Sequence, residues 1–150
     1  MNKYRTHKCN ELRKEDVDKK ISLSGWINKK RDHGNLLFID LRDNYGITQC
    51  IIDKENKYFF DLEKIQLETV IKVDGKVVNR SKETINKEID TGDIEIVIEK
   101  YQVLGKCKEL PMPIFSDQEY AEEIRLKYRF LDLRRKKIHE NIILRSKVIS

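Results

Sequence analysis

The chain has 150 residues, of which 39% are hydrophobic and 38% charged, with six glycines and two prolines. This composition excludes collagen-like, low-complexity and intrinsically disordered proteins. The longest uninterrupted apolar run has four residues, Leu36 to Ile39, whereas a membrane span needs roughly 18. No apolar stretch follows the basic residues near the N-terminus, so we expect neither a membrane span nor a secretory signal, and we expect a cytoplasmic protein.

The net charge of +5 is unevenly distributed along the chain. Residues 1–31 carry 10 basic and 4 acidic side chains, residues 32–105 carry 10 and 15, and residues 106–150 carry 11 and 7. Segregated positive charge suits a polyanionic partner, because Lys and Arg that neutralise phosphates release counterions. Solvated surface charge is the alternative, so charge alone does not identify nucleic acid as the partner.

The cysteines and histidines are too scattered to suggest a metal site. Cys9, Cys50 and Cys107 stand 41 and 57 residues apart, and the three histidines are spread just as widely. Neither set has the spacing of zinc ligands, and an odd number of cysteines favours free thiols in a reducing compartment. We therefore predict no metal site in this chain.

Short strands are predicted in the first third of the chain. Alternation in residues 21–27 places Ile21, Leu23, Gly25 and Ile27 on one face, and in residues 36–42 the inward set is Leu37, Ile39 and Leu41. Gly34 and Asn35 between the two strands suit a tight hairpin turn. Residues 47–53 form a third predicted strand. Both faces of this strand carry apolar side chains, so the choice of buried face stays open.

A short helix is predicted to interrupt the strands, with Asn56 as a candidate N-cap and an end near Gln66. Two further strands follow, over residues 71–77 and 93–101, with a long polar loop between them. Three strands, a helix and two strands is the order of a five-stranded Greek-key barrel of the oligonucleotide-binding (OB) type. We predict this mostly β fold over residues 1–105, with a generic antiparallel sandwich as the alternative.

The last third of the chain has a different pattern. Both prolines fall in a stretch that fits neither a strand nor a helix period, which predicts an extended linker over residues 106–117. Ser116 and Glu119 have the spacing of a capping box, and helical spacing continues over residues 118–150. No stop signal precedes Ser150, so we expect the helical start of a domain that continues further. A two-helix appendage on the barrel is the alternative.

Five strings of the sequence point to a family. They are Gly-Trp-Ile-Asn-Lys-Lys-Arg-Asp-His-Gly at 25–34, Phe-Ile-Asp-Leu-Arg-Asp at 38–43, Gly-Ile-Thr-Gln at 46–49, Thr-Gly-Asp-Ile-Glu at 91–95 and Arg-Leu-Lys-Tyr-Arg-Phe-Leu-Asp-Leu-Arg-Arg at 125–135. Together they resemble the N-terminal anticodon-binding region of bacterial-type aspartyl-tRNA synthetases, which are class II aminoacyl-tRNA synthetases, plus the start of the catalytic domain. Lysyl- and asparaginyl-tRNA synthetases share the barrel, and the string at 131–135 favours the aspartyl branch.

The resemblance implies an aspartate–tRNA ligase, which activates aspartate with ATP and Mg²⁺ as an aspartyl-adenylate and then transfers it to tRNA(Asp). The full-length enzyme of this family is a homodimer, and its catalytic residues would lie beyond Ser150, so no catalytic residue is assigned and neither ATP nor Mg²⁺ is expected to bind this segment. The alternatives are a stand-alone OB module for single-stranded nucleic acid and a lysyl- or asparaginyl-type synthetase.

Five side chains are candidate anticodon contacts. Strand alternation turns Phe38 outward, where a ring can stack a base, and the resemblance assigns it to the middle uridine. Gln49 and Arg31 can hydrogen-bond a base edge, and the resemblance gives both that role. It also places Glu95 near the first anticodon base and Arg80 near the third base or its phosphate. Packing under a loop and cross-strand ion pairing are the structural alternatives.

Two further residues bear on tRNA specificity. In the resembled family, histidine at the position of His33 accompanies enzymes that charge both aspartate and asparagine tRNAs, which predicts relaxed third-base recognition and tRNA(Asn) as a second partner. Thr84 stands where aspartate-specific members often carry a larger amide. Loop side chains of this kind set which base is rejected, through clashes or unpaired polar groups.

Overall fold

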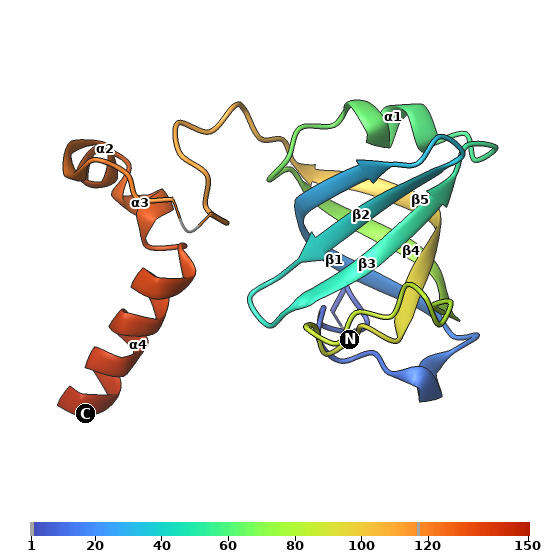
Figure 1. Ribbon diagram of the computed structural model, residues 1–150, viewed down its shortest axis with the longest axis horizontal. Helices are drawn as coiled ribbons and strands as arrows, with labels where there is room; N and C mark the ends of the chain where they lie inside the picture. The colour runs from blue at the N-terminus through green and yellow to red at the C-terminus, as the bar shows by residue number, and fades with distance from the viewer. Residues whose placement is uncertain (1, 117) are drawn as a thin grey trace. The chain divides into compact units, whose positions relative to one another are not determined.

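The structure is a computed structural model that describes residues 2–116 and 118–150. Contacts divide the chain into two compact units, Met1–Lys108 and Glu109–Ser150. We call the first the barrel unit and the second the helical unit. Figure 1 shows that the first consists mainly of strands, with helix α1, and the second of helices.

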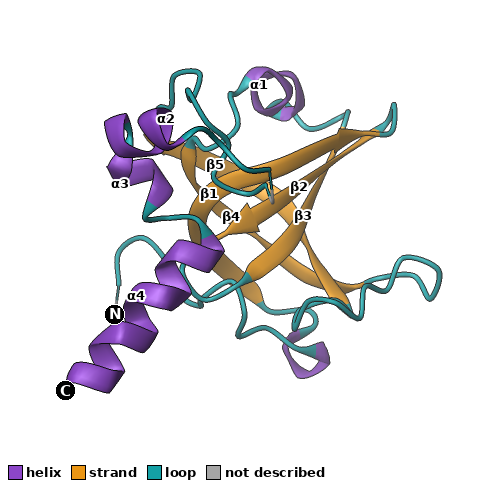
Figure 2. Cartoon of the chain, turned by 60° about the vertical axis from the view of Figure 1, so that its left-hand side comes forward, coloured by secondary structure: helices purple, strands orange, loops and turns teal. Residues whose placement is uncertain are grey.

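The barrel unit is a closed ring of five strands in the order β1-β2-β3-β5-β4. β1 pairs antiparallel with both β2 and β4, and β5 pairs antiparallel with β4 and parallel with β3. Figure 2 shows the ring with its strands crossing at a steep tilt. This confirms the five-stranded Greek-key barrel. The strands are β1 (Lys20–Asp32), β2 (Leu36–Arg42), β3 (Ile47–Asp53), β4 (Val70–Asn79) and β5 (Ile94–Gly105).

β2 and β3 have the predicted bounds, whereas β1 is much longer than predicted and ends at Asp32 instead of near Ile27. Its length follows from its two partners, because its first half pairs with β4 and its second half with β2. The register on β2 shifts between Ile27 and Lys29, which makes Asn28 the extra residue of a β-bulge. Such a bulge bends the strand and lets it serve two neighbours.

The barrel interior is filled by the apolar positions predicted for β1, β2, β4 and β5. β3 contributes Thr48, Cys50 and Ile52, all fully buried, which resolves the choice of face left open by the sequence. Gly25 faces inward where β1 meets β2, and a Cβ atom there would overlap the carbonyl oxygen of Arg42. The main apolar members are Ile21, Leu23, Ile27, Leu37, Ile39, Leu41, Ile71, Val73, Val77, Ile94, Ile96 and Ile98.

Helix α1 (Phe59–Lys64) lies at one end of the barrel (Figure 1) and is shorter than predicted. Its N-cap is Tyr58 and not Asn56, although the Asn56 side chain accepts a 3.0 Å hydrogen bond from the Tyr58 N–H just outside the helix. At its other end the Lys30 ammonium donates to three backbone carbonyl oxygens at 2.6 to 3.3 Å. These carbonyls have no partner within the helix, so Lys30 caps it from β1.

The helical unit contains α2 (Glu122–Lys127), α3 (Arg129–Asp132) and α4 (Lys136–Ile149). The predicted helix start after Ser116 is wrong, because the first helix begins only at Glu122. Ser116 Oγ does accept a 3.0 Å hydrogen bond from the Gln118 N–H, while Asp117, between them, lies outside the described residues. Met112, Ile114 and Leu131 form a small separate core, against which Leu110, Tyr120 and Tyr128 pack.

The carboxylate of Asp132 is the charged centre of this unit. It is fully buried and lies 3.1 Å from Arg125 Nε, 2.7 Å from Arg129 Nη1 and 3.6 Å from Arg135 Nη1. Burial works to raise the pKa of Asp132, but the hydrogen bond from Arg125 and the three positive charges outweigh it and lower that pKa.

Within the described part of the chain, no helix combines the length and the apolar character that crossing a membrane requires.

Candidate nucleic-acid interface

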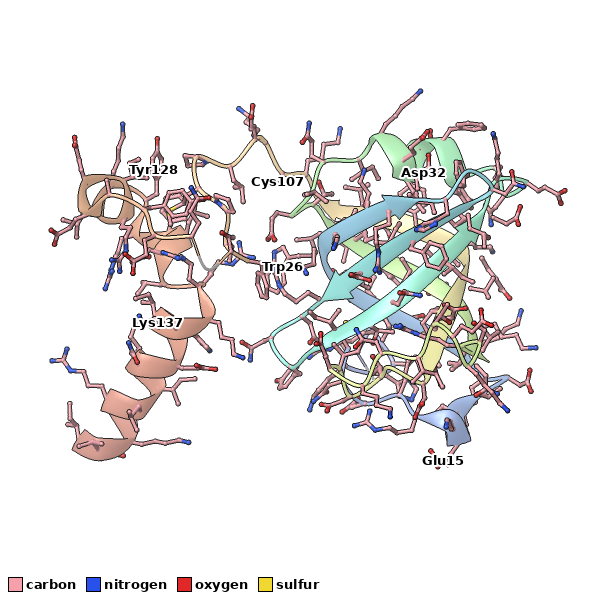
Figure 3. The ribbon with its side chains drawn as sticks, in the orientation of Figure 1. Glu15, Trp26, Asp32, Cys107, Tyr128 and Lys137 are labelled. Atoms are coloured by element: carbon pink, nitrogen blue, oxygen red, sulfur yellow. The ribbon has the colours of Figure 1, made fainter. Side chains whose placement is uncertain are left out.

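A hollow of about 440 Å³ opens on the outer face of the barrel unit, where β1, β2 and β3 meet the loop that leads from β4 to β5. Asp32, labelled in Figure 3, marks the end of β1 and lies between two lining residues of the hollow, Arg31 and His33. Six of the seven side chains singled out from the sequence line it, and the seventh, Glu95, joins them through a hydrogen bond. The lining residues are Arg31, His33, Phe38, Asp40, Ile47, Gln49, Arg80, Thr84, Asn86 and Ile89.

Hydrogen bonds link four polar side chains, one from each of β1, β2, β3 and β5. Arg31 Nη2 donates to Asp40 Oδ1 at 2.8 Å and to Gln49 Oε1 at 3.1 Å. Gln49 Nε2 in turn donates to Glu95 Oε2 at 2.8 Å. Gln49 is only 6% exposed, so both ends of a buried amide are held by charged groups. An amide oxygen and an amide NH₂ can each make a second hydrogen bond, which leaves capacity for a base edge.

Phe38 faces the hollow from the outer side of β2, directly across from Arg31 on β1. Its ring meets the His33 ring edge to face, with 5.1 Å between centroids and 78° between planes. The ring does not belong to the main core. Single-strand binding proteins stack bases on aromatic side chains that are partly exposed in this way.

Arg80 lies deeper, at the start of the loop between β4 and β5, and is only 8% exposed. Its Nε donates to the Ile94 carbonyl oxygen at 2.9 Å and its Nη1 to the Thr84 carbonyl oxygen at 3.3 Å. Its Nη2 is buried without a hydrogen-bond partner among the described residues. Burial lowers the pKa of Arg80, while the nearby carboxylates of Glu95 and Asp40 act to raise it. An arginine guanidinium remains charged in proteins, so Arg80 places a positive charge with an unused donor at the hollow.

Sequence reasoning missed four residues of this hollow. Asp40 could have been found, because it shares the outer face of β2 with Phe38 and sits opposite Gln49 in the strand register. Ile47, Asn86 and Ile89 carried no such signal, since two of them belong to a loop without any period and the third begins a strand whose buried face was ambiguous. The hollow is lined by two arginines and the carboxylate of Asp40, and Glu95 adds a second carboxylate beside it through Gln49. The charges of this group balance, which suits an uncharged base better than a phosphate.

A family model described as an OB-fold nucleic acid binding domain matches residues 21–104. The chain therefore belongs to this family of anticodon-binding OB domains. It is 76% identical over 150 residues to an aspartate–tRNA(Asp/Asn) ligase of Pelagibacter ubique (strain HTCC1062), which covers all of this chain and 25% of that protein. The resemblance to aspartyl-tRNA synthetases is thereby confirmed.

Two further relatives agree with this assignment. An aspartate–tRNA(Asp/Asn) ligase of Phenylobacterium zucineum (strain HLK1) is 53% identical over 149 residues, covering 99% of this chain and 25% of that protein. The crystal structure of asparaginyl-tRNA synthetase from Pyrococcus horikoshii in complex with asparaginyl-adenylate matches with a TM-score of 0.71 and 28% identity, covering 85% of this chain and 28% of that one. The chain thus spans about a quarter of the length of the curated relatives it matches.

Proposed function

We propose that the barrel unit reads the anticodon for an aspartate–tRNA ligase that acts on tRNA(Asp) and tRNA(Asn) in the cytoplasm. The observation that carries the proposal is that one hollow is lined by the Phe38 ring, by the Gln49 amide with a hydrogen bond at each end, and by the buried Arg80 with an unused donor. The names of the two curated relatives reported above, both aspartate–tRNA(Asp/Asn) ligases, support the choice of tRNAs.

Each side chain has a definite task in this proposal. Phe38 stacks the middle uridine, and Gln49 pairs with its edge through the second hydrogen-bonding capacity of its amide. Glu95 accepts hydrogen bonds from the first anticodon base, and Arg80 donates to an acceptor on the third base or its phosphate. His33, held against Phe38, leaves the third position tolerant of both cytidine and uridine.

The chemical steps belong to the complete ligase, a homodimer in our proposal. It would use ATP and Mg²⁺ to activate aspartate before transfer to the tRNA. Among residues 2–116 and 118–150, no group of three or more His, Cys, Asp or Glu side chains could hold a metal ion. What the barrel unit contributes is selection of the tRNA.

The test is a binding titration of the chain with anticodon stem-loops that carry GUC, GUU or a substituted middle base, at two salt concentrations. We expect GUC and GUU to bind alike and the substituted loop to bind about tenfold or more weakly, since a lost bidentate base contact costs about 1–3 kcal/mol. Equal binding of all three loops with only a steep salt dependence would contradict base reading and indicate a general single-strand binder.

A further inference from the structure

The Gln49 amide has a fixed direction. Its oxygen accepts from Arg31 and its nitrogen donates to Glu95. Turning the amide by 180° would set its NH₂ against the guanidinium and its oxygen against the carboxylate, so that two donors face each other at one end and two acceptors at the other. Only one of the two amide orientations is therefore compatible with these charged neighbours.

Asp40 supports this arrangement from the side. It sits opposite Gln49 in the pairing of β2 with β3 and accepts from the same Arg31 nitrogen, Nη2, that donates to the amide. That nitrogen has two hydrogens, and the two bonds use one each. The Arg31 side chain is 40% exposed and the Asp40 side chain 19% exposed, so without the carboxylate the guanidinium would be held at one point only and could swing into solvent.

We propose that Asp40 is a positioning residue that fixes the Gln49 amide through Arg31, and that this fixed direction selects uridine over cytidine at the middle anticodon position. This inference rests on the proposed function. It concerns how the middle base is chosen, and it gives Asp40 a role that is exerted through Arg31.

The chemistry of the two pyrimidines explains the selection. Uracil presents an N3–H donor beside a carbonyl acceptor at C4, whereas cytosine presents an N3 acceptor beside an amino donor at C4. The two edges are thus reversed in polarity. An amide held in one direction pairs with one edge and places like groups against the other, whereas an amide that can turn accepts both.

The experiment compares the binding of stem-loops with anticodons GUC and GCC to the chain and its variants. Asp40→Ala is expected to reduce the preference for GUC by about tenfold, mostly through tighter GCC binding, because a bidentate contact discriminates by about 1–3 kcal/mol. Asp74→Ala is the matched control. The Asp74 carboxylate on β4 accepts a hydrogen bond from Ser22 of β1 and pairs with Lys72, and it lies outside the hollow. This variant should keep the full preference.

A double-mutant cycle tests the route through Arg31. Once Arg31 is replaced by alanine, adding Asp40→Ala should change the preference no further, because residues that act through one contact are not additive. A further loss of preference in that background would show that Asp40 acts by another route, such as its charge on Arg80, and would overturn the proposal.

Each remaining outcome is decisive. If the unaltered chain shows no preference for GUC over GCC, the proposed function itself fails. If it shows the preference and Asp40→Ala keeps it, or weakens both stem-loops equally, only the positioning role fails. Should Asp40→Ala not fold, Asp40→Asn preserves the side-chain volume with a weaker acceptor, and a loss of about threefold in preference is then expected. An unchanged preference in that variant overturns the inference.

Discussion

Replacing Phe38 by alanine should separate RNA binding from folding. The ring faces the hollow and is absent from the main core, so its removal leaves no interior cavity and should lower the free energy of unfolding by at most about 2 kcal/mol, mainly through the lost contact with His33. Loss of a stacked base costs about 1–3 kcal/mol, which corresponds to about a 5- to 150-fold weaker complex. The edge contact with His33, at 5.1 Å, adds about 0.5–1.5 kcal/mol that helps to hold the ring in place.

The assay is fluorescence anisotropy of a GUC stem-loop, run beside urea denaturation of the same samples. Phe60→Ala is the matched control, because Phe60 is 51% exposed on α1 and does not line the hollow. It should leave binding unchanged. A Phe38→Ala chain that binds within twofold of the unaltered chain would refute base stacking, and a large loss of stability would show that the ring is structural.

Three further predictions concern the fold. Gly25→Ala should destabilise the barrel by about 1–3 kcal/mol in urea denaturation, because the new Cβ overlaps the Arg42 carbonyl oxygen and forces β1 from β2. The pKa of Asp132 is lowered in the folded protein. Its carboxylate therefore stabilises the helical unit at pH values above 3.8, the ordinary pKa of an aspartate, and this contribution is lost as the pH falls through the lower pKa of the folded state. Asp132→Asn should therefore raise amide hydrogen exchange in residues 122–135 at neutral pH. Alkylation followed by mass spectrometry should label Cys107 first, because burial covers the other two thiols and raises their pKa.

The strands could be predicted from the sequence where one face is consistently apolar. In residues 36–42 every second residue from Leu37 to Leu41 is apolar, and the structure gives β2 those bounds. β3 gave no such answer, because its buried face depends on the partners that the barrel supplies. On the outer side of the strand, the buried Gln49 amide is held by hydrogen bonds with Arg31 and Glu95. No local pattern encodes a contact of that kind.

The candidate site was predicted in two different ways. Alternation alone turned Phe38 outward, whereas the roles of Gln49, Arg31 and Arg80 came from the family resemblance. The structure brings these side chains to one hollow, while their roles toward RNA stay predictions. The start of α2 was mispredicted because a capping sequence at Ser116 specifies only a turn when the following residues pack their side chains, such as Tyr120, against a neighbouring core.

The bulge at Asn28 means that β1 follows two alternation frames. Counted in steps of two from Ile27, Arg31 would share the inward face. The extra residue reverses the frame, so that Lys30 pairs with Ile39 and reaches α1, while Arg31 pairs with Phe38 and reaches the hollow. If Asn28 were paired in regular alternation, Arg31 would turn toward the interior and Lys30 away from the helix; deletion of Asn28 would instead remove the bulge and keep Arg31 opposite Phe38. The bulge therefore determines that Arg31, and not its neighbour Lys30, is the basic side chain of this strand that reaches the hollow.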